Sequence, residues 1–288
     1  MLSYRHSFHA GNHTDVLKHT VFVALLRYLA KKDKPFMCID THAGPVVHDL
    51  EGIYARKNKE FETGISRLWA KLVLPPLLDD YRDQVRALNP NREKLRHYPG
   101  SPQLALQLLR RKDALRLIEL HSTESANLEK HFRDGDKRVQ VTAGDGFERV
   151  LKMLPPPQRR ALVLIDPSYE VKDDYAHVPA TVRDALKLFA TGTYMVWHPL
   201  VQRRDCARLP DALKRQCELA PTGKVDWLHV TLNVKRPAED GFGLHGSGLF
   251  IVNPPWTLPE QLRETMPWLV DALGQDDSAN FSLDFKIA

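Results

Sequence analysis

The stretch at positions 166–169 combines residue types that can hold the amino group of a nucleobase. Asp166 and Pro167 follow the apolar run 161–165, and Tyr169 comes two residues later. A carboxylate and a backbone carbonyl held rigid by proline can accept the hydrogens of an exocyclic amino group, while a tyrosine ring stacks on the base. The stretch therefore predicts chemistry at a weakly nucleophilic base nitrogen. An Asp-Pro pair after a strand is also common at sites with no such role.

Three further acidic residues stand where predicted strands end. Asp40 follows the run 36–39, Glu119 lies at the end of 115–120, and Asp145 follows 139–141 with Gly146 beside it. In an open α/β sheet, ligands bind outside the carboxyl ends of the strands. An acid in the position of Glu119 can accept the ribose hydroxyls of a nucleoside, and one in the position of Asp145 can accept an adenine amino group. The pattern predicts a nucleoside-bearing cofactor beside Asp166.

Short apolar runs alternate with helical patterns along most of the chain. The runs predict seven buried strands at 36–39, 115–120, 139–141, 161–165, 194–197, 228–232 and 249–252. The helical patterns cover 15–31, 103–111, 124–132, 147–154 and 180–190. This alternation favours an α/β fold with a doubly wound, mostly parallel sheet. The connection 233–248 is short, so we expect the seventh strand to be antiparallel at the end of the sheet, with Asn253 opposite the cofactor edge.

One interval is several times longer than an ordinary crossover, which predicts an inserted helical subdomain at 46–98. The main domain would then comprise residues 1–45 and 99–288. The polar tail after Gly274 is expected to be loosely held.

Composition bounds the class of protein. Lys and Arg total 41 against 36 Asp and Glu, a mildly basic balance that suits a polyanionic partner. Cys38, Cys206 and Cys217 have no metal-ligand spacing, and an odd count without an export signal indicates the reducing cytoplasm. The apolar stretches are too short to span a bilayer, so no membrane association is expected.

The first fourteen residues carry aromatic, basic and histidine side chains before the first helix. Tyr4, Arg5 and His6 suit stacking and phosphate contact, which predicts an RNA-facing segment at 1–14. Histidines also occur at 9 and 13, but no carboxylate or cysteine stands at ligand spacing, so no metal is expected. Lys18 and His19 open the first helix and are expected to point into the cofactor cleft.

Several segments in order along the chain resemble the bacterial large-subunit ribosomal RNA methyltransferase J family. They are 1–20, 40–44, 98–102, 119–121, 145–147, 164–167, 189–194 and 253–256. The resemblance implies a Rossmann-like class I methyltransferase fold that uses S-adenosylmethionine to methylate N6 of adenine 2030 in 23S ribosomal RNA. It also implies roles for individual residues. The methyl donor would contact His19, His42, Ser101, Glu119, Asp145, Gly146 and Asp166, with Asp166 also the catalytic acceptor beside Pro167 and Tyr169.

The resemblance places the RNA against Tyr4, and the basic residues Arg5, His6 and Lys18 complete the expected RNA contacts. The protein is expected to act as a monomer. Ser168 departs from the Asp-Pro-Pro-Tyr pattern of the family and loosens the turn, and 45–47 depart from the small residues that usually follow Gly44.

Two alternatives remain open at this stage. A guanine-N2 RNA methyltransferase would use a similar tetrapeptide and the same donor site. A non-catalytic RNA-binding protein that retains the fold is the alternative from another class.

Overall fold

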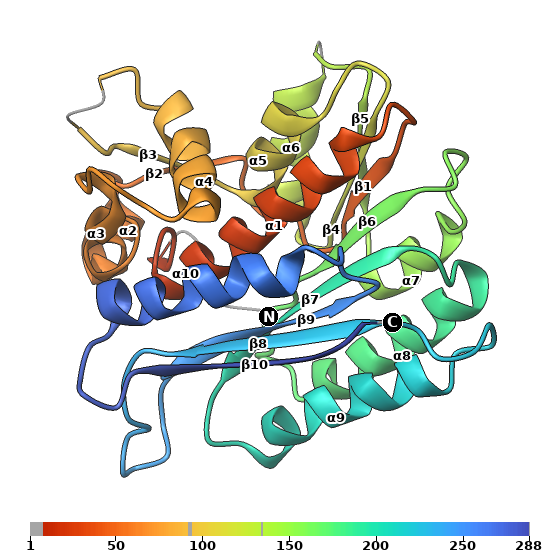
Figure 1. The fold of residues 1–288 in the computed structure, drawn as a ribbon. Helices are drawn as coiled ribbons and strands as arrows, with labels where there is room; N and C mark the ends of the chain where they lie inside the picture. The colour runs from red at the N-terminus through yellow and green to blue at the C-terminus, as the bar shows by residue number, and fades with distance from the viewer. Residues whose placement is uncertain (1–7, 92–93, 134, 288) are drawn as a thin grey trace.

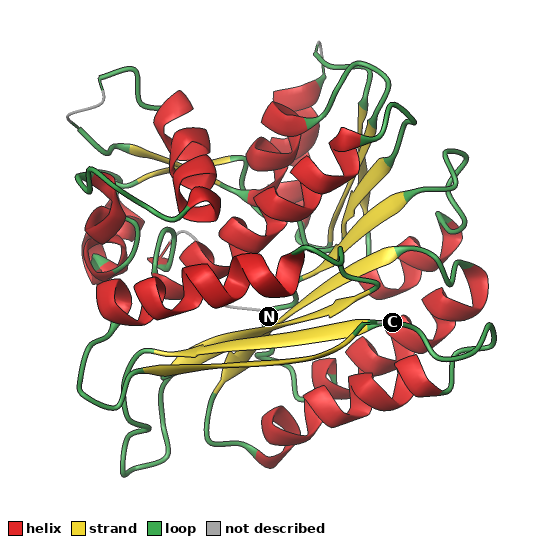
Figure 2. Ribbon diagram, viewed as in Figure 1, coloured by secondary structure: helices red, strands yellow, loops and turns green. Residues whose placement is uncertain are grey.

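The computed structural model describes residues 8–91, 94–133 and 135–287, which form a central sheet with helices on both faces (Figures 1 and 2). The sheet has the strand order β10-β8-β9-β7-β6-β1-β4-β5. Its strands are β1 (Met37–Asp40), β4 (Ala114–Glu119), β5 (Val139–Ala143), β6 (Ala161–Ile165), β7 (Thr193–Leu200), β8 (Trp227–Asn233), β9 (Gly246–Val252) and β10 (Asn280–Lys286).

The helices that flank the sheet alternate with these strands along the chain. They are α1 (His13–Lys31), α5 (Ser101–Leu108), α6 (Ser122–Phe132), α7 (Gly146–Lys152), α8 (Asp174–Leu188), α9 (Arg204–Glu218) and α10 (Leu258–Leu273). In Figure 1, α1, α5, α6 and α10 cover one face of the sheet, and α7, α8 and α9 cover the other. None of the helices in the described ranges is long and apolar enough to cross a membrane.

Strand pairing confirms the α/β class and the mostly parallel sheet. The strands β5, β4, β1, β6 and β7 run parallel to one another. Two details of the expected sheet are wrong. The sheet contains eight strands rather than seven, and β9 lies between β7 and β8, antiparallel to both, rather than at the end of the sheet.

The additional strand, β10, occupies the tail that was expected to be loosely held. Phe281, Leu283 and Phe285 alternate with polar residues and pack against the main core, while β10 pairs antiparallel with β8. An alternation of this kind is the period of a half-buried edge strand, which has one apolar face to bury.

Buried side chains form two core clusters, one on each face of the sheet. Within β6, Leu162 and Leu164 belong to the cluster beneath α1 and α10, while Val163 and Ile165 belong to the cluster beneath α8 and α9. Successive side chains of a strand point to opposite faces. A strand that is covered on both faces is therefore apolar throughout, which is why the continuous runs in the sequence predicted these strands.

The interval between β1 and α5 contains the small elements β2 (Val47–Asp49), α2 (Ile53–Asn58), η2 (Glu60–Thr63), α3 (Ser66–Trp69), α4 (Pro76–Ala87) and β3 (His97–Pro99). The strands β2 and β3 pair antiparallel at its base. Its buried side chains, including Ile65, Leu68 and Tyr81, join the core cluster that contains α1. A separate subdomain at 46–98 remains a prediction.

Asn253 lies at the opposite edge of the sheet from Asp166, as expected. It follows the antiparallel strand β9, and its side-chain amide donates hydrogen bonds to the carbonyls of Ala190 and Gly192, at 2.8 and 2.7 Å. These carbonyls immediately precede the amino end of β7. Asn253 therefore holds the α8–β7 turn.

A buried histidine and a half-buried one contact each other over the strand β9. The Nε2 atoms of His198 on β7 and His229 on β8 lie 3.0 Å apart, and a Cβ on Gly248 between them would come within 2.3 Å of the His198 ring. Burial lowers the pKa of His198 to about 4, and burial together with His198 lowers that of His229 to about 3.

We expect the free energy of unfolding to fall as the pH falls from 6.5 towards 4. Within that interval the unfolded chain binds protons at these histidines and the folded protein does not, so acidification favours unfolding. His198 alone should contribute about 2 kcal/mol of destabilisation at pH 5 relative to neutral pH. Urea unfolding at pH 7.5 and pH 5.0 measures this loss, and a His198→Gln variant should lose less between the two conditions. An equal loss in the wild type and in His198→Gln would contradict this contribution.

Candidate active site

Four acidic residues stand at the carboxyl edge of adjacent parallel strands. Asp40 is the last residue of β1, and Glu119 is the last residue of β4. Asp166 follows β6 directly, and Asp145 follows β5 after one intervening residue. The strand order β6-β1-β4-β5 places these ends side by side. The structure thus assembles all four acids along the edge where an α/β sheet binds ligands.

The Asp40 carboxylate is buried at the turn after β1. It accepts a hydrogen bond from the Ser101 hydroxyl at 2.6 Å and one from the backbone N–H of His42 at 3.2 Å. The pKa of Asp40 is raised to about 7, chiefly by burial and also by the nearby Asp166, while the Ser101 hydrogen bond acts to lower it. Ser101, at the start of α5, is therefore fixed against the first strand.

Glu119 joins two of the turns at this edge. One carboxylate oxygen accepts a hydrogen bond from the Gly44 N–H at 3.0 Å, and the other accepts one from the His121 N–H at 2.7 Å. Each carboxylate oxygen can accept more than one hydrogen bond. Glu119 can therefore position both turns and still accept from a ligand hydroxyl.

The turn after β1 packs directly against the start of α7. Asp145 caps this helix by accepting the Phe147 N–H at 2.7 Å. A Cβ on Gly146 would lie 2.0 Å from the Thr41 carbonyl oxygen, so only glycine permits this approach. The His42 ring lies 4.9 Å from the Phe147 ring, and burial lowers the pKa of His42 to about 4, which keeps it neutral.

The helix α1 brings Lys18 to Asp166. The Lys18 ammonium lies 2.6 Å from Asp166 Oδ2 and 3.1 Å from Asp15 Oδ1, and the Lys18 side chain is only 5% exposed. Lys18 was expected to contact RNA, which stays a prediction; in the structure its ammonium contacts the Asp166 carboxylate. Sequence patterns gave no sign of this pair, because its members lie 148 positions apart.

His19, expected to contact the methyl donor, is fully buried beside Lys18. Its Nδ1 atom forms a 2.7 Å hydrogen bond with the Tyr98 hydroxyl, and Tyr98 shares a second hydrogen bond of 2.8 Å with Tyr81. His19 therefore links α1 to β3 and α4. His19 thus lies within the first turns of α1, next to Lys18, and its side chain is not at the surface.

Pro167 and Tyr169 form the loop after Asp166. Tyr169 has a φ of 55°, and its hydroxyl donates a 2.8 Å hydrogen bond to the Trp197 carbonyl. The ring is 4% exposed and packs beside the rings of Tyr175 and Trp197. The Ser168 hydroxyl accepts a 3.4 Å hydrogen bond from the Glu170 N–H.

The inserted elements also hold the start of α1. The side chain of Asn12 caps this helix, and its amide donates a 2.9 Å hydrogen bond to Glu60 of η2. The other Glu60 oxygen lies 2.8 Å from His9 Nδ1, and this hydrogen bond raises the pKa of His9. Sequence reasoning missed Glu60, since a single acid within the long interval 46–98 carries no recognisable signal. The predicted RNA residues Tyr4, Arg5 and His6 lie outside the described residues.

Within residues 8–91, 94–133 and 135–287, no group of three or more His, Cys, Asp and Glu side chains could hold a metal ion. The edge instead offers oxygen acceptors, backbone turns in close contact and a carboxylate paired with a lysine. Such an arrangement can bind a nucleoside and orient an amino group by hydrogen bonds.

Comparison with known proteins gives matches over nearly the whole chain. The family described as "Ribosomal RNA large subunit methyltransferase D, RlmJ" matches residues 33–286. Two proteins named ribosomal RNA large subunit methyltransferase J are similar. The one from Haemophilus influenzae is 41% identical over 99% of both chains, and the one from Escherichia coli is 43% identical over 93% of both. A crystal structure of protein LPL1258 from Legionella pneumophila superposes with a TM-score of 0.85, at 33% identity, over 96% of this chain and 97% of that one.

Proposed function

The chain belongs to the ribosomal RNA large subunit methyltransferase J family, and we propose that it methylates N6 of an adenine, position 2030, in 23S ribosomal RNA. The observation that supports this most directly is the position of Asp166. It stands on the same sheet edge as Asp40, Glu119 and Asp145, next to the turn that packs on Gly146. A base amino group held at Asp166 therefore lies beside the nucleoside site.

The residues at this edge fit S-adenosylmethionine. Gly44 has a φ of 60°, and a Cβ there would meet no described atom within 4 Å, so the turn after β1 leaves room for a ligand. The donor, when bound, supplies an electrophilic methyl group on cationic sulfur, and the protein contributes mainly position. The residues that would hold it are His19, His42, Ser101, Glu119, Asp145, Gly146 and Asp166.

Asp166 and the Pro167 carbonyl accept the hydrogens of the adenine amino group. This directs the nitrogen lone pair at the methyl group. Lys18 occupies one Asp166 oxygen, Oδ2, so the amino group binds the other oxygen or replaces Lys18. Tyr169 stacks on the base in this proposal, and to do so its ring must leave its packing against Tyr175 and Trp197.

Glu119 is the residue whose loss should weaken donor binding most selectively. A Glu119→Ala variant loses charge-assisted hydrogen bonds to the ribose and to the Gly44 turn, so its affinity for S-adenosylmethionine should fall roughly tenfold or more. Isothermal titration calorimetry measures this affinity. Glu119→Gln, which keeps an acceptor oxygen, should retain more of it. Unchanged affinity of the alanine variant would contradict the assignment.

Nucleoside analysis tests the reaction itself. Mass spectrometry of 23S ribosomal RNA from a strain that lacks the protein should show the loss of one N6-methyladenine, restored by the wild-type gene. Loss of an N2-methylguanine would favour the guanine enzyme. No change in modification, together with no calorimetric binding of S-adenosylmethionine, would favour a non-catalytic RNA-binding protein. Within the proposal, the protein acts as a cytoplasmic monomer with ribosomal RNA as its partner.

A further inference from the structure

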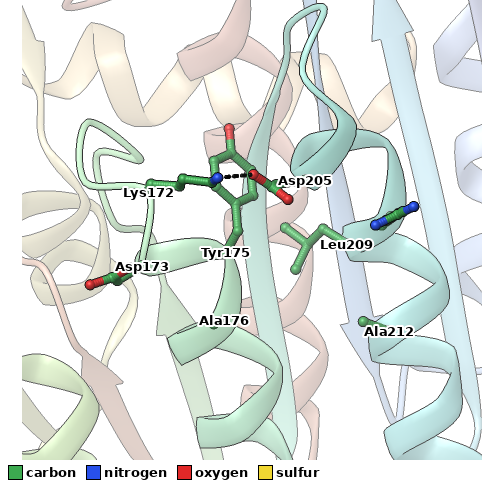
Figure 3. Close-up of a pocket in the computed structure, with 8 residues that line it drawn as sticks. Lys172, Asp173, Tyr175, Ala176, Asp205, Leu209 and Ala212 are labelled. Carbon is green, nitrogen blue, oxygen red and sulfur yellow. Dashed lines mark ion pairs between the residues drawn. The ribbon is translucent and has the colours of Figure 1, made fainter.

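A cavity of about 350 Å³ lies between the beginnings of α8 and α9. Figure 3 shows Tyr175 and Ala176 on the α8 side of this cavity and Leu209 and Ala212 on the α9 side. Since α8 follows β6 and α9 follows β7, both helices begin at the carboxyl edge of the sheet. The cavity therefore opens on the same edge as Asp166.

A single aromatic contact connects the cavity to the catalytic loop. The Tyr175 ring, which lines the cavity, lies 4.8 Å from the Tyr169 ring. A group bound in the cavity would thus lie against Tyr175, next to the loop that carries Tyr169 and, in the proposed function, the target base. This position suits the nucleotide beside a flipped adenine.

The lining combines an apolar floor with charged groups at the opening. Tyr175 and Leu209 are 8% and 2% exposed and form the floor. At the opening, Lys172 and Asp205 form an ion pair of 3.7 Å whose side chains are 81% and 39% exposed, so it is weak and easily exchanged for a ligand. Arg208 is exposed beside them and has no ion pair among the described residues.

We propose that this cavity binds one unpaired nucleotide of the RNA next to the target adenine. The inference rests on the proposed function. The base lies against Tyr175 and Leu209, the Asp205 carboxylate accepts from the base edge, and Arg208 binds the phosphate. The volume lies at the lower end of the range of about 300–1,000 Å³ for ligand pockets, which suits one nucleotide rather than a helix or a peptide.

A base-removal scan combined with a cavity-filling variant tests the proposal. The substrate is a 23S ribosomal RNA fragment in which each nucleotide near the target adenine is replaced in turn by an abasic one. For the wild-type protein, one flanking position should raise KM about tenfold through lost stacking while kcat is kept. Ala212→Trp should raise KM about tenfold with intact RNA. For this variant, KM should not rise further when the RNA carries the abasic nucleotide at the sensitive position. Ala207→Trp, exposed on the same helix but outside the cavity, should behave as wild type.

A charge variant keeps the test decisive if Ala212→Trp fails to fold. Arg208→Glu should raise KM and reduce the salt dependence of RNA binding, whereas Arg215→Glu, exposed further along α9, should do so less. Donor affinity should be unchanged in all variants. The proposal would be overturned if no abasic position raised KM, or if the effects of the abasic RNA and of Ala212→Trp were additive. It would also be overturned if the two arginine variants had equal effects. Failure of the wild type to methylate intact RNA would instead overturn the proposed function.

Discussion

Replacing Asp166 with alanine should lower turnover on 23S ribosomal RNA fragments by about a hundredfold or more. In the proposed mechanism its carboxylate accepts the amino hydrogens most strongly in the transition state, where the nitrogen becomes pyramidal. Donor affinity should remain largely intact, because Glu119 and Asp145, which are also proposed to hold the donor, are unchanged. Single-turnover methylation and calorimetry measure the two quantities separately. Turnover within roughly threefold of wild type would exclude the proposed role.

Asn253 provides the matched control, because residues 253–256 keep both prolines of the Asp-Pro-Pro-Tyr pattern, whereas 166–169 have Ser168 in place of the second. Its amide holds the turn before β7 at the opposite edge of the sheet. Asn253→Ala should therefore cost less than about tenfold in turnover and act through stability, while Tyr169→Ala should cost far more. If Asn253→Ala abolished methylation in a folded protein and Tyr169→Ala did not, the catalytic site would have to be reassigned to residues 253–256.

Replacing Gly146 with alanine should be the most damaging change at the donor site. The new Cβ would lie 2.0 Å from the Thr41 carbonyl oxygen, and a backbone atom cannot move aside as a flexible side chain can. The turn after β1 and the start of α7 must therefore separate. We expect S-adenosylmethionine affinity to fall about tenfold or more and unfolding to become easier by about 1–3 kcal/mol.

Gly135→Ala is the control for this change, since the nearest atom to its Cβ would be 3.6 Å away, an ordinary contact. It should leave both donor affinity and stability close to wild type. Calorimetry and urea unfolding of the two variants provide the measurements. Wild-type donor affinity in Gly146→Ala would show that the close approach does not shape the binding site.

The sequence predicted the parts of this structure that depend on local patterns. Continuous apolar runs mark strands that are covered on both faces, and the acid after each run marks its carboxyl end. Asp40, Glu119, Asp145 and Asp166 could therefore be placed on one edge before any coordinates were known. The same reasoning placed Asn253 at the other edge, because a short connection reverses the strand.

Features that depend on which distant segments meet could not be predicted in this way. The insertion of β9 between β7 and β8 depends on which strands pair with each other. The spacing of apolar residues along one strand carries no information about which strand lies beside it. Likewise, nothing local to Lys18 or Asp166 indicates their contact. The strand β10 has a local signal, because Phe281, Leu283 and Phe285 alternate with polar residues. The polar character of the segment after Gly274 nevertheless predicted a loosely held tail.

The position of β8 has a consequence for how the protein is made. Its two neighbours in the sheet, β9 and β10, are both synthesised after it. While the nascent chain leaves the ribosome, both edges of the apolar strand β8 therefore remain unpaired until β9 and β10 have been synthesised. Unpaired apolar edges promote aggregation. Pairing of β8 with β9 and then with β10 thus ends the interval in which its edges are open to aggregation.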